Sequence, residues 1–377
     1  MLSPDEINRY KRHLSLPGFG IENQEKLKAA SVLVVGAGGL GSPVLLYLAA
    51  AGVGTIGIAD HDKVDISNLQ RQIIYTIDDV GKFKAEAAAN RISQLNPHTV
   101  VNIIAEKLTT QNAYDLIAGY DVVVDGTDNF STRYMINDAC VLLGKPCVSG
   151  SVFRFEGQVI VLNALQHNGS RGPNYRQLFP YSSMKENGID CSSAGVLGVL
   201  PGIIGTLQAT EVIKLLTGSG DILSGELLLI NSLNLQILKV KLSAALNQEP
   251  TPHNRIEFEK WNYDSVSCSL NETISTAELM QLLENERSPL IVDVRMPMEF
   301  PEAEGLQAIN IPLPVLQQQT AQIENADTIV VFCKSGQRSK KALEILKTNL
   351  PGKRVFSLQG GIEEWNRVFE INLRNQP

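Results

Sequence analysis

The chain has 377 residues, of which 44% are hydrophobic and 19% are charged, an ordinary composition for a globular protein of two or three domains. A net charge of −7 argues against general nucleic-acid binding, and no apolar run appears long enough in the sequence to predict a membrane span. Five scattered cysteines exclude a disulfide framework, and their odd number leaves at least one thiol free. We therefore predict a reducing, cytoplasmic setting.

The first part of the chain alternates short β-branched runs with longer helical patterns. Four of these runs have the composition of buried parallel strands, over residues 31–36, 55–60, 99–106 and 121–127. This alternation predicts a Rossmann-like, doubly wound α/β sheet. After residues 131–144 the pattern changes, and two segments indicate antiparallel additions to the sheet, residues 151–163 and 226–242.

A second, smaller α/β unit is predicted near the carboxyl end. Residues 165–194 are polar and read as a loop, and a buried-looking helix follows at 202–218. Weak periodicity places a linker at residues 246–272, between a domain of residues 1–245 and one of residues 273–377. The second domain should hold strands at 290–295, 308–312, 328–333 and 354–358, with helices around 276–286, 337–349 and 362–369.

The segment VLVVGAGGLGS carries Gly36, Gly38 and Gly41 between a predicted strand and a predicted helix. Glycine lets the backbone approach a phosphate closely, and the helix N-terminus supplies free N–H groups and a positive dipole end. Asp60 ends the next strand, where a carboxylate can accept hydrogen bonds from ribose hydroxyls. These features predict a nucleotide site, and an NAD-dependent oxidoreductase would share them.

Polar residues next to this site favour a triphosphate. They follow the ribose-binding acid or the end of a later strand: Asn68, Gln70, Arg71, Lys84, Asp128 and Asn129. Arg71 and Lys84 can neutralise phosphate oxygens, and Asp128 can hold magnesium. A dehydrogenase needs its own acid or base, whereas the histidines we considered are scattered in apparent loops: His61, His98, His167 and His253.

With these motifs, the chain closely resembles the MoeB/ThiF family, bacterial relatives of the ubiquitin-activating enzymes. The shared features are RYKRH (9–13), VGAGGLGS (35–42), Asp60 with SNLQRQ (67–72), Lys84, GTDN (126–129) and EGQV (156–159), within about the first 245 residues. The resemblance implies a homodimer that uses ATP and magnesium to adenylate the C-terminal glycine of a small ubiquitin-like sulfur carrier of the MoaD/ThiS type. It also implies a nucleotide site of Gly39, Asp60, Ser67, Asn68, Leu69, Gln70, Arg71, Lys84, Asp128 and Asn129, with Arg12 reaching the neighbouring subunit's phosphates.

Two cysteine-related features distinguish this chain within that family. Cys191, in ENGIDCSSAGVLG, is either a packing residue or, by correspondence with thioester-forming relatives, a nucleophile. Many relatives bind structural zinc through two CxxC pairs. Here the first pair is replaced by Asn174 and Gln177, and the second leaves only Cys268. Because one thiol cannot build a tetrahedral zinc site, we predict none.

The segment FCKSGQRSKKALEIL places Cys333 after an apolar strand and before a helix. The C-terminal unit resembles the rhodanese family through VDVR (292–295), AINIPL (308–313), VVFCKSGQRS (330–339) and LQGGIEEW (358–365). The resemblance implies that a loop of Cys333, Lys334, Ser335, Gly336, Gln337 and Arg338 wraps its N–H groups around the sulfur of a thiolate or persulfide. The usual histidine-containing stretch before AINIP is replaced by residues 296–307, which bears on donor access.

A tyrosine-phosphatase-like loop is an alternative for this cysteine, since it also pairs cysteine with arginine. Such a loop places its arginine one residue further from the cysteine than Arg338 lies here, so the shorter loop suits sulfur better than phosphate.

Together the two halves predict an enzyme that adenylates a carrier's tail and then transfers sulfur to it from a persulfide on Cys333, loaded by a cysteine desulfurase or another donor. Predicted catalytic residues are Cys333, Cys191, Arg71, Lys84 and Asp128. Three alternatives remain: an adenylyltransferase for a peptide or small carboxylate with a passive rhodanese module, an NAD-dependent oxidoreductase, and a regulatory sulfur-binding module. Molybdopterin, thiamine, tRNA-thiolation and specialised metabolite pathways all use this chemistry, so the sequence does not select the carrier.

Overall fold

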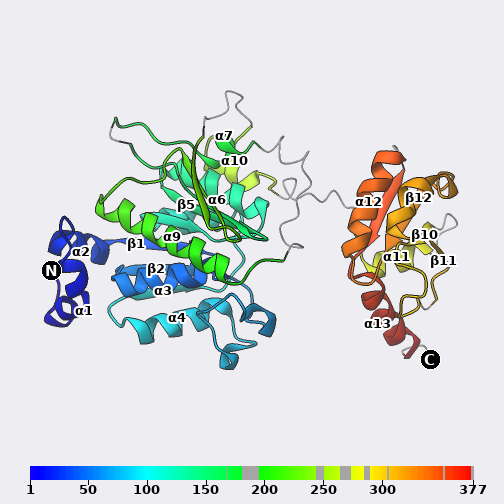
Figure 1. Ribbon diagram of the computed structural model, residues 1–377, viewed down its shortest axis with the longest axis horizontal. Coiled ribbons are helices and arrows are strands. Elements are labelled where there is room, and N and C mark those ends of the chain that lie inside the picture. Colours follow the sequence, from blue (N-terminus) through cyan, green and yellow to red (C-terminus); the bar gives the residue numbers. More distant parts are fainter. Residues whose placement is uncertain are drawn as a thin grey trace. The chain divides into compact units, whose positions relative to one another are not determined.

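In the computed structural model, the described residues are 1–166, 168–180, 195–242, 250–263, 273–283, 289–303, 305–350 and 353–374. The chain forms two compact units, Met1–Cys268 (unit 1) and Ser269–Pro377 (unit 2). Figure 1 shows the helices and strands of each unit and labels many of them.

An eight-stranded sheet forms the centre of unit 1, in the order β3-β2-β1-β4-β5-β6-β7-β8. Strands β3 to β5 run parallel, and β6, β7 and β8 are antiparallel additions. The predicted doubly wound sheet with antiparallel additions is therefore confirmed. The strand bounds are β1 (Ser31–Val35), β2 (Thr55–Ala59), β3 (Val100–Ile104), β4 (Val122–Asp125), β5 (Cys147–Phe153), β6 (Glu156–Leu162), β7 (Glu226–Asn231) and β8 (Gln236–Lys241).

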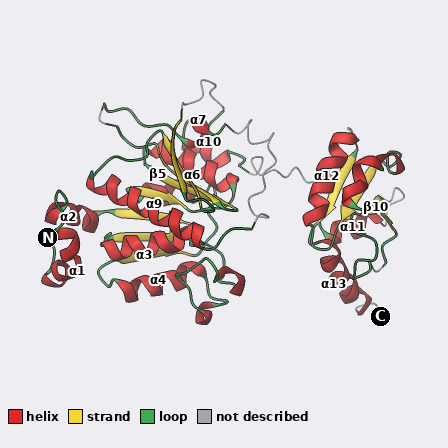
Figure 2. Cartoon of the chain, in the orientation of Figure 1, coloured by secondary structure: helices red, strands yellow, loops and turns green. Residues whose placement is uncertain are grey.

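Helices cover both faces of this sheet, as Figure 2 shows for the strands in yellow and the helices in red. Alternate strand residues point to opposite faces, so Val32 and Val34 join one buried cluster while Leu33 and Val35 join the other. The helix bounds are α1 (Pro4–Leu14), α2 (Gly20–Ala29), α3 (Gly41–Ala51), α4 (Lys84–Leu95), α5 (Ala113–Ala118), α6 (Phe130–Leu143), α7 (Tyr175–Leu178), α9 (Val199–Thr217) and α10 (Arg255–Lys260), with short 3-10 turns η1 (Ile66–Asn68) and η2 (Ile77–Asp79).

Helix α9 corrects the expectation that no apolar run is long enough to span a membrane. Its 19 residues are long and apolar enough, by length and composition alone, to cross a membrane. However, 44% of its 18-residue apolar stretch is buried inside the protein. Leu200, Ile204 and Val212 pack into the sheet core, and the buried Gln208 donates hydrogen bonds to the backbone of β4 and β5. These contacts make α9 a core helix of unit 1.

Two further elements differ from the sequence prediction. Strand β3 was expected to be buried, but it lies at the sheet edge and Val100 is 59% exposed. Within the predicted linker, residues 255–260 form α10, whose Phe258 is fully buried together with Tyr263 in the core of unit 1. At least residues 255–263 therefore pack as part of unit 1.

Unit 2 is built on five parallel strands in the order β11-β10-β12-β13-β9. Strand β12 lies at the centre of this sheet, between β10 and β13, and is completely buried. The residue after it therefore lies at the carboxyl edge of the sheet centre. The bounds are β9 (Thr273–Ile274), β10 (Leu290–Asp293), β11 (Ala308–Asn310), β12 (Thr328–Phe332), β13 (Arg354–Leu358), α11 (Thr276–Leu283), α12 (Gln337–Asn349) and α13 (Gly361–Arg374), with 3-10 turns η5 (Leu313–Gln318) and η6 (Thr320–Gln322).

Candidate functional site

A glycine-rich loop connects β1 to α3 at the carboxyl edge of the unit 1 sheet. Gly36 has a φ of +90°, and a Cβ there would lie 2.9 Å from the carbonyl oxygen of Gly126. A Cβ on Gly41 would lie 2.0 Å from the carbonyl oxygen of Gly36, which no side chain can tolerate. Glycine is therefore required at both positions to keep the loop folded tightly over the strand ends.

Asp60 lies beside this loop at the end of β2. One carboxylate oxygen accepts the N–H of Ala37 at 2.8 Å, and the other accepts the N–H of Asp62 at 2.9 Å. Burial raises the pKa of Asp60, although Lys84 and the two N–H groups act in the opposite direction. The carboxylate is thus held in a fixed orientation next to the glycine loop, where a ribose can reach it.

Lys84, at the start of α4, has a partner that the sequence did not reveal. Its ammonium lies 2.7 Å from a carboxylate oxygen of Asp62, and its side chain is only 8% exposed. Burial alone would raise the pKa of Asp62, but the hydrogen bond and charge of Lys84 hold it below its usual value. A phosphate that binds Lys84 must therefore compete with Asp62.

The glycine loop opens onto a cavity of about 1050 Å³. Nine of the predicted nucleotide-site residues line it: Gly36, Gly38, Gly39, Asp60, Gln70, Arg71, Lys84, Asp128 and Asn129. The other predicted residues lie outside the lining: Arg12, Gly41, Ser67, Asn68 and Leu69. Arg71 contacts Ser67 through a hydrogen bond to its carbonyl oxygen, and Arg12 is exposed on α1. The structure thus brings most of the predicted set together in one place.

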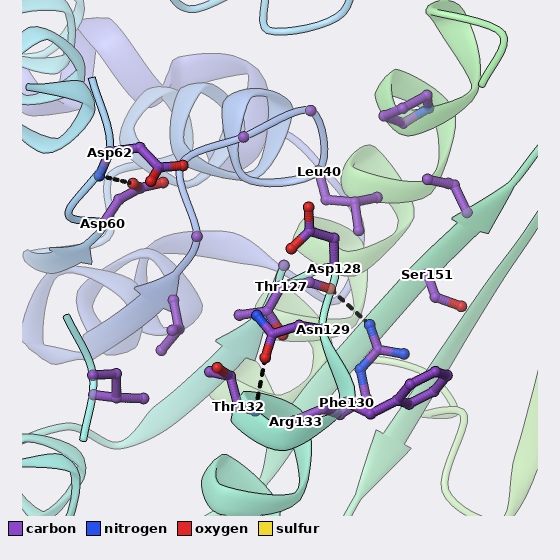
Figure 3. Close-up of a pocket in the computed structure, with 18 of the residues that line it drawn as sticks. Leu40, Asp60, Asp62, Thr127, Asp128, Asn129, Phe130, Thr132, Arg133 and Ser151 are labelled. Carbon is purple, nitrogen blue, oxygen red and sulfur yellow. Dashed lines mark hydrogen bonds between the residues drawn. The ribbon is translucent and has the colours of Figure 1, made fainter. Parts of the chain in front are cut away.

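Asp128 and Asn129 end the loop between β4 and α6, across the cavity from Asp60. Asn129 caps α6, because its side-chain oxygen accepts the N–H of Thr132 at 2.9 Å. Asp128 is exposed and makes no hydrogen bond or ion pair with any described residue. Figure 3 shows its carboxylate among the cavity-lining residues, directed away from Arg133. A free carboxylate at this place has the hard oxygen ligands that magnesium prefers.

A buried ion pair beneath this loop was missed by the sequence reading. The Asp125 carboxylate accepts hydrogen bonds from the Thr127 backbone and hydroxyl and from Ser149, and it lies 3.0 Å from Nε of Arg133. Arg133 also donates to the carbonyl oxygens of Thr127 and Gly150. Both side chains are almost completely buried. This network fixes the backbone that presents Asp128 to the cavity.

The cavity continues past the nucleotide residues toward β5, β6 and α9. Its further lining is partly aromatic and includes Phe130, Tyr134, Phe153, Tyr175 and Phe179, together with Ser151, Gln158 and Gly195. An apolar extension beside a charged nucleotide site gives space for a second substrate next to the phosphates. His61, one of the histidines scattered in apparent loops, also lines the cavity and is 55% exposed.

The positions expected for the first pair of zinc cysteines form a helix cap instead. Asn174 accepts the N–H of Gln177, and the Gln177 side chain accepts the N–H of Asn174. Helix α7 is further anchored by Arg176, which makes a bidentate ion pair with the buried Asp138 at 2.7 and 2.8 Å. Tyr263 donates to the same carboxylate at 2.8 Å. Cys191 and Cys268 lie outside the described residues, so their predicted roles remain predictions.

In unit 2, Cys333 directly follows β12 and is 1% exposed. The backbone N–H of Arg338 donates to its sulfur at 3.2 Å, and the Ser339 hydroxyl lies 3.7 Å from that sulfur. Burial raises the pKa of the thiol, but the hydrogen bonds from Ser339, Ser335 and Arg338 outweigh it and leave the pKa of Cys333 below its ordinary value. Gly336 turns the chain with a φ of +92°.

Both cations of this loop are paired with carboxylates. Arg338 makes a bidentate pair with Glu299, with N–O distances of 2.6 and 2.7 Å. Lys334 lies 3.5 Å from Glu363 on α13. The positive charge of Lys334 and Arg338 is therefore offset in part by these two carboxylates. The Arg338 guanidinium interacts with both Glu299 and the Cys333 sulfur, and both raise the pKa of Arg338.

Comparison with known families assigns both units. Residues 10–251 match the model of the ThiF family, and residues 275–368 match that of the rhodanese-like domain. The predicted resemblance to both families is confirmed.

Relatives with both units are similar over almost the whole chain. The "probable adenylyltransferase/sulfurtransferase MoeZ" of Mycobacterium tuberculosis is 41% identical, over 99% of this chain and 96% of that protein. The "adenylyltransferase and sulfurtransferase MOCS3" of Drosophila grimshawi is 39% identical, over 98% of this chain and 86% of that protein. The prediction of an enzyme with adenylyltransferase and sulfurtransferase activities is confirmed by these relatives.

Solved structures share the fold of part of this chain. E. coli MccB, in a crystal structure with AMPCPP and MccA, has a TM-score of 0.54 at 26% identity, over 63% of this chain and 72% of that one. MccB with ATP gives a TM-score of 0.53 at 25% identity, over 63% and 73% of the two chains.

Proposed function

Because the chain belongs to the ThiF family and carries a rhodanese-like domain behind it, we propose that it adenylates the C-terminal glycine of a ubiquitin-like sulfur carrier and converts it to a thiocarboxylate. ThiF-family adenylyltransferases use ATP. The observation that supports the proposal best is the single cavity that joins the glycine loop, Asp60, Arg71 and Lys84 to Asp128 and then to an apolar extension. A nucleotide fits the charged part, and an extended peptide tail fits the rest.

In the first step, the carrier's carboxylate attacks the α-phosphate of ATP, pyrophosphate leaves, and an acyl-adenylate forms. No general base is needed, because the carboxylate is already ionised at neutral pH. Asp60 would hold the ribose, while Arg71 and Lys84 would offset the charge that develops on the phosphates. Asp128 would hold magnesium, which when bound stabilises the leaving pyrophosphate.

In the second step, the terminal sulfur of a Cys333 persulfide attacks the acyl carbon, and AMP leaves. The product is an acyl disulfide between the carrier and Cys333. Cys191 or an external thiol then attacks Sγ of Cys333, which breaks the S–S bond and releases the carrier thiocarboxylate. The new disulfide between Cys333 and the attacking thiol is then reduced by a second thiol. The lowered pKa of Cys333 supports this role, because its thiolate accepts the sulfur that it later delivers.

We also propose a homodimer, a cysteine desulfurase or similar persulfide donor, and a cytoplasmic location. Helices α1 to α3 and the turn between α1 and α2 expose apolar side chains, among them Ile7, Leu16, Ile21 and Tyr47. Each is at least 43% exposed, which favours burial by a second copy. Arg12 lies on α1 outside its own cavity, where it is free to serve the neighbouring subunit. The free thiols of Cys140, Cys147 and Cys333 suit a reducing compartment.

Two measurements on the full chain test the proposal. ATP–pyrophosphate exchange should depend on magnesium and on a carrier that ends in Gly-Gly, and a carrier without its last glycine is the control. Intact-mass analysis should then show replacement of one carrier oxygen by sulfur. Cys333→Ser should keep the exchange and lose the sulfur product. Absence of exchange with every Gly-Gly carrier, or binding of NAD in preference to ATP, would falsify the adenylation step.

A further inference from the structure

Glu299 has a defined place beside the sulfur-binding loop. It lies in residues 296–307, the stretch that replaces the usual histidine-containing segment of rhodaneses. Oε1 of Glu299 accepts hydrogen bonds from the backbone N–H of Met296, at 2.8 Å, and from one terminal nitrogen of the Arg338 guanidinium. Oε2 accepts a hydrogen bond from the other terminal nitrogen of Arg338. The carboxylate is therefore fixed from its own turn as well as from the loop.

The ion pair between Glu299 and Arg338 persists over the whole neutral pH range. The hydrogen bonds from Arg338 and Met296 lower the pKa of Glu299 to about 2, so it stays ionised far below pH 7. Arg338 is always protonated. The other cation of the loop, Lys334, faces Glu363. The two cations and the two carboxylates next to Cys333 thus sum to zero charge. Uncharged N–H and O–H donors contribute most to the lowered pKa of the Cys333 thiol, and the Arg338 guanidinium also interacts with the sulfur.

Charge balance matters for the choice of sulfur donor. Thiosulfate carries two negative charges, so its binding next to the Cys333 thiolate is strengthened by unpaired cations at the loop. A persulfide carried on a thiol has at most one charge on its sulfur pair, and its affinity can come from the rest of the donor molecule. Both terminal guanidinium nitrogens of Arg338 donate to Glu299, so thiosulfate must compete with this carboxylate for the charge of Arg338.

We propose that Glu299 is a specificity-determining residue that makes Cys333 accept sulfur from a thiol-bound persulfide in preference to thiosulfate. This inference rests on the proposed sulfur-transfer function and specifies its donor class. In the favoured reaction, the Cys333 thiolate attacks the terminal sulfur of R–S–S⁻, a new S–S bond forms on Cys333, and R–S⁻ leaves. In the disfavoured reaction the same attack on thiosulfate releases sulfite.

The test measures how fast the full chain takes up sulfur at Cys333, in single-turnover reactions followed by intact mass, without ATP or carrier. Glutathione persulfide and thiosulfate are compared over a range of concentrations. The wild-type protein should load from the persulfide with an apparent second-order constant at least about tenfold higher than from thiosulfate. Comparable constants for the two donors would overturn the proposal.

Substitution of Glu299 tests its role directly. Glu299→Gln removes the countercharge and should lower the half-saturating thiosulfate concentration by roughly tenfold, with little change in the maximal rate or in persulfide loading. Asp327→Asn is the matched control, because it removes one carboxylate from an exposed pair with Lys353 at the opposite end of β12. It should leave both donors unchanged.

A double variant separates charge from loop distortion. Glu299→Gln with Arg338→Gln keeps the backbone N–H at Cys333 but restores zero net charge, so the gain with thiosulfate should disappear. A gain that survives in the double variant, or no gain in Glu299→Gln, would contradict the proposal. If Cys333 accepts sulfur from neither donor, the proposed sulfur-transfer function itself fails, which is a distinguishable result.

Discussion

The glycine loop of unit 1 and the cysteine loop of unit 2 have equivalent positions in their sheets but differ in the space and charge around them. Each follows a central parallel strand and leads into a helix, α3 in one case and α12 in the other. The first opens onto a cavity of about 1050 Å³ with charged groups on several elements. The second closes tightly around one sulfur atom, with its cations paired to carboxylates. A reactant that must enter and leave requires space, whereas a sulfur held covalently requires only local donors.

The largest expected effect is on the free energy of unfolding, when the ion pair next to each loop is broken. Asp125→Asn leaves the buried Arg133 without its counter-ion and should lower the free energy of unfolding of unit 1 by about 3–5 kcal/mol. Glu299→Gln breaks a pair that is about one-third exposed and should change stability little. Urea unfolding of the two variants, compared with the wild type, measures both. Equal losses would show that the two loops depend on their ion pairs to the same degree.

Gly41→Ala tests how closely the glycine loop must approach the strand ends. The new Cβ would lie 2.0 Å from the carbonyl oxygen of Gly36, so the backbone must move. We expect pyrophosphate exchange to fall by about 100-fold, since a shift of this size misplaces the reacting groups. Gly38→Ala is the control for stability, because its Cβ meets only the Gln72 amide at an ordinary 3.6 Å. Unchanged exchange in Gly41→Ala would contradict this geometry.

Asp62→Asn tests whether a carboxylate of unit 1 competes with phosphate for a cation, as Glu299 is proposed to compete with thiosulfate in unit 2. The change releases Lys84 from its pair at 2.7 Å and makes it available to phosphate. The KM for ATP should fall by about threefold, the size expected for a partly exposed pair. Asp65→Asn, which removes a nearby carboxylate that bonds only within its own turn, should leave the KM unchanged. A rise in KM for Asp62→Asn would show that this carboxylate takes part in binding.

The smallest expected effect is a shift in the titration of Cys333. Because its pKa is lowered in the folded protein, the thiolate should persist at pH values below the ordinary cysteine range near 8.5. The rate of alkylation by iodoacetamide, followed by peptide mass analysis, should therefore reach half its maximum at a lower pH in the folded chain than in the urea-unfolded chain. Coincident profiles would show that the loop does not stabilise the anion.

Much of this arrangement could be predicted from local sequence. The helix over residues 337–349 and the strands around Cys333 follow directly from apolar spacing, and the glycine spacing indicated the loop between β1 and α3. These features depend on neighbouring residues. The pairs Lys84–Asp62 and Arg338–Glu299 join residues 22 and 39 positions apart, so they depend on where helices start and how turns fold. Charge pattern alone could not distinguish a phosphate-binding cation from one that already has a partner.

The missed edge position of β3 and the missed helix α10 have a similar cause. Val100 and Ile103 have the composition of a central strand, but strand order is a property of the whole sheet, and β3 has one neighbour only. Residues 255–260 are too few and too polar for a clear helical period, and Phe258 becomes buried only because unit 1 provides a site for it. Tertiary contacts decided both cases.

The cap formed by Asn174 and Gln177 has a consequence for the conditions in which this enzyme can be made. Thiolate metal sites are readily attacked by sulfane sulfur, the very species that Cys333 is proposed to carry. A segment anchored by amides and by the Asp138–Arg176 pair presents no such target. We expect the first unit to reach its folded state in chelator-treated medium and to survive prolonged exposure to its own reactive cargo.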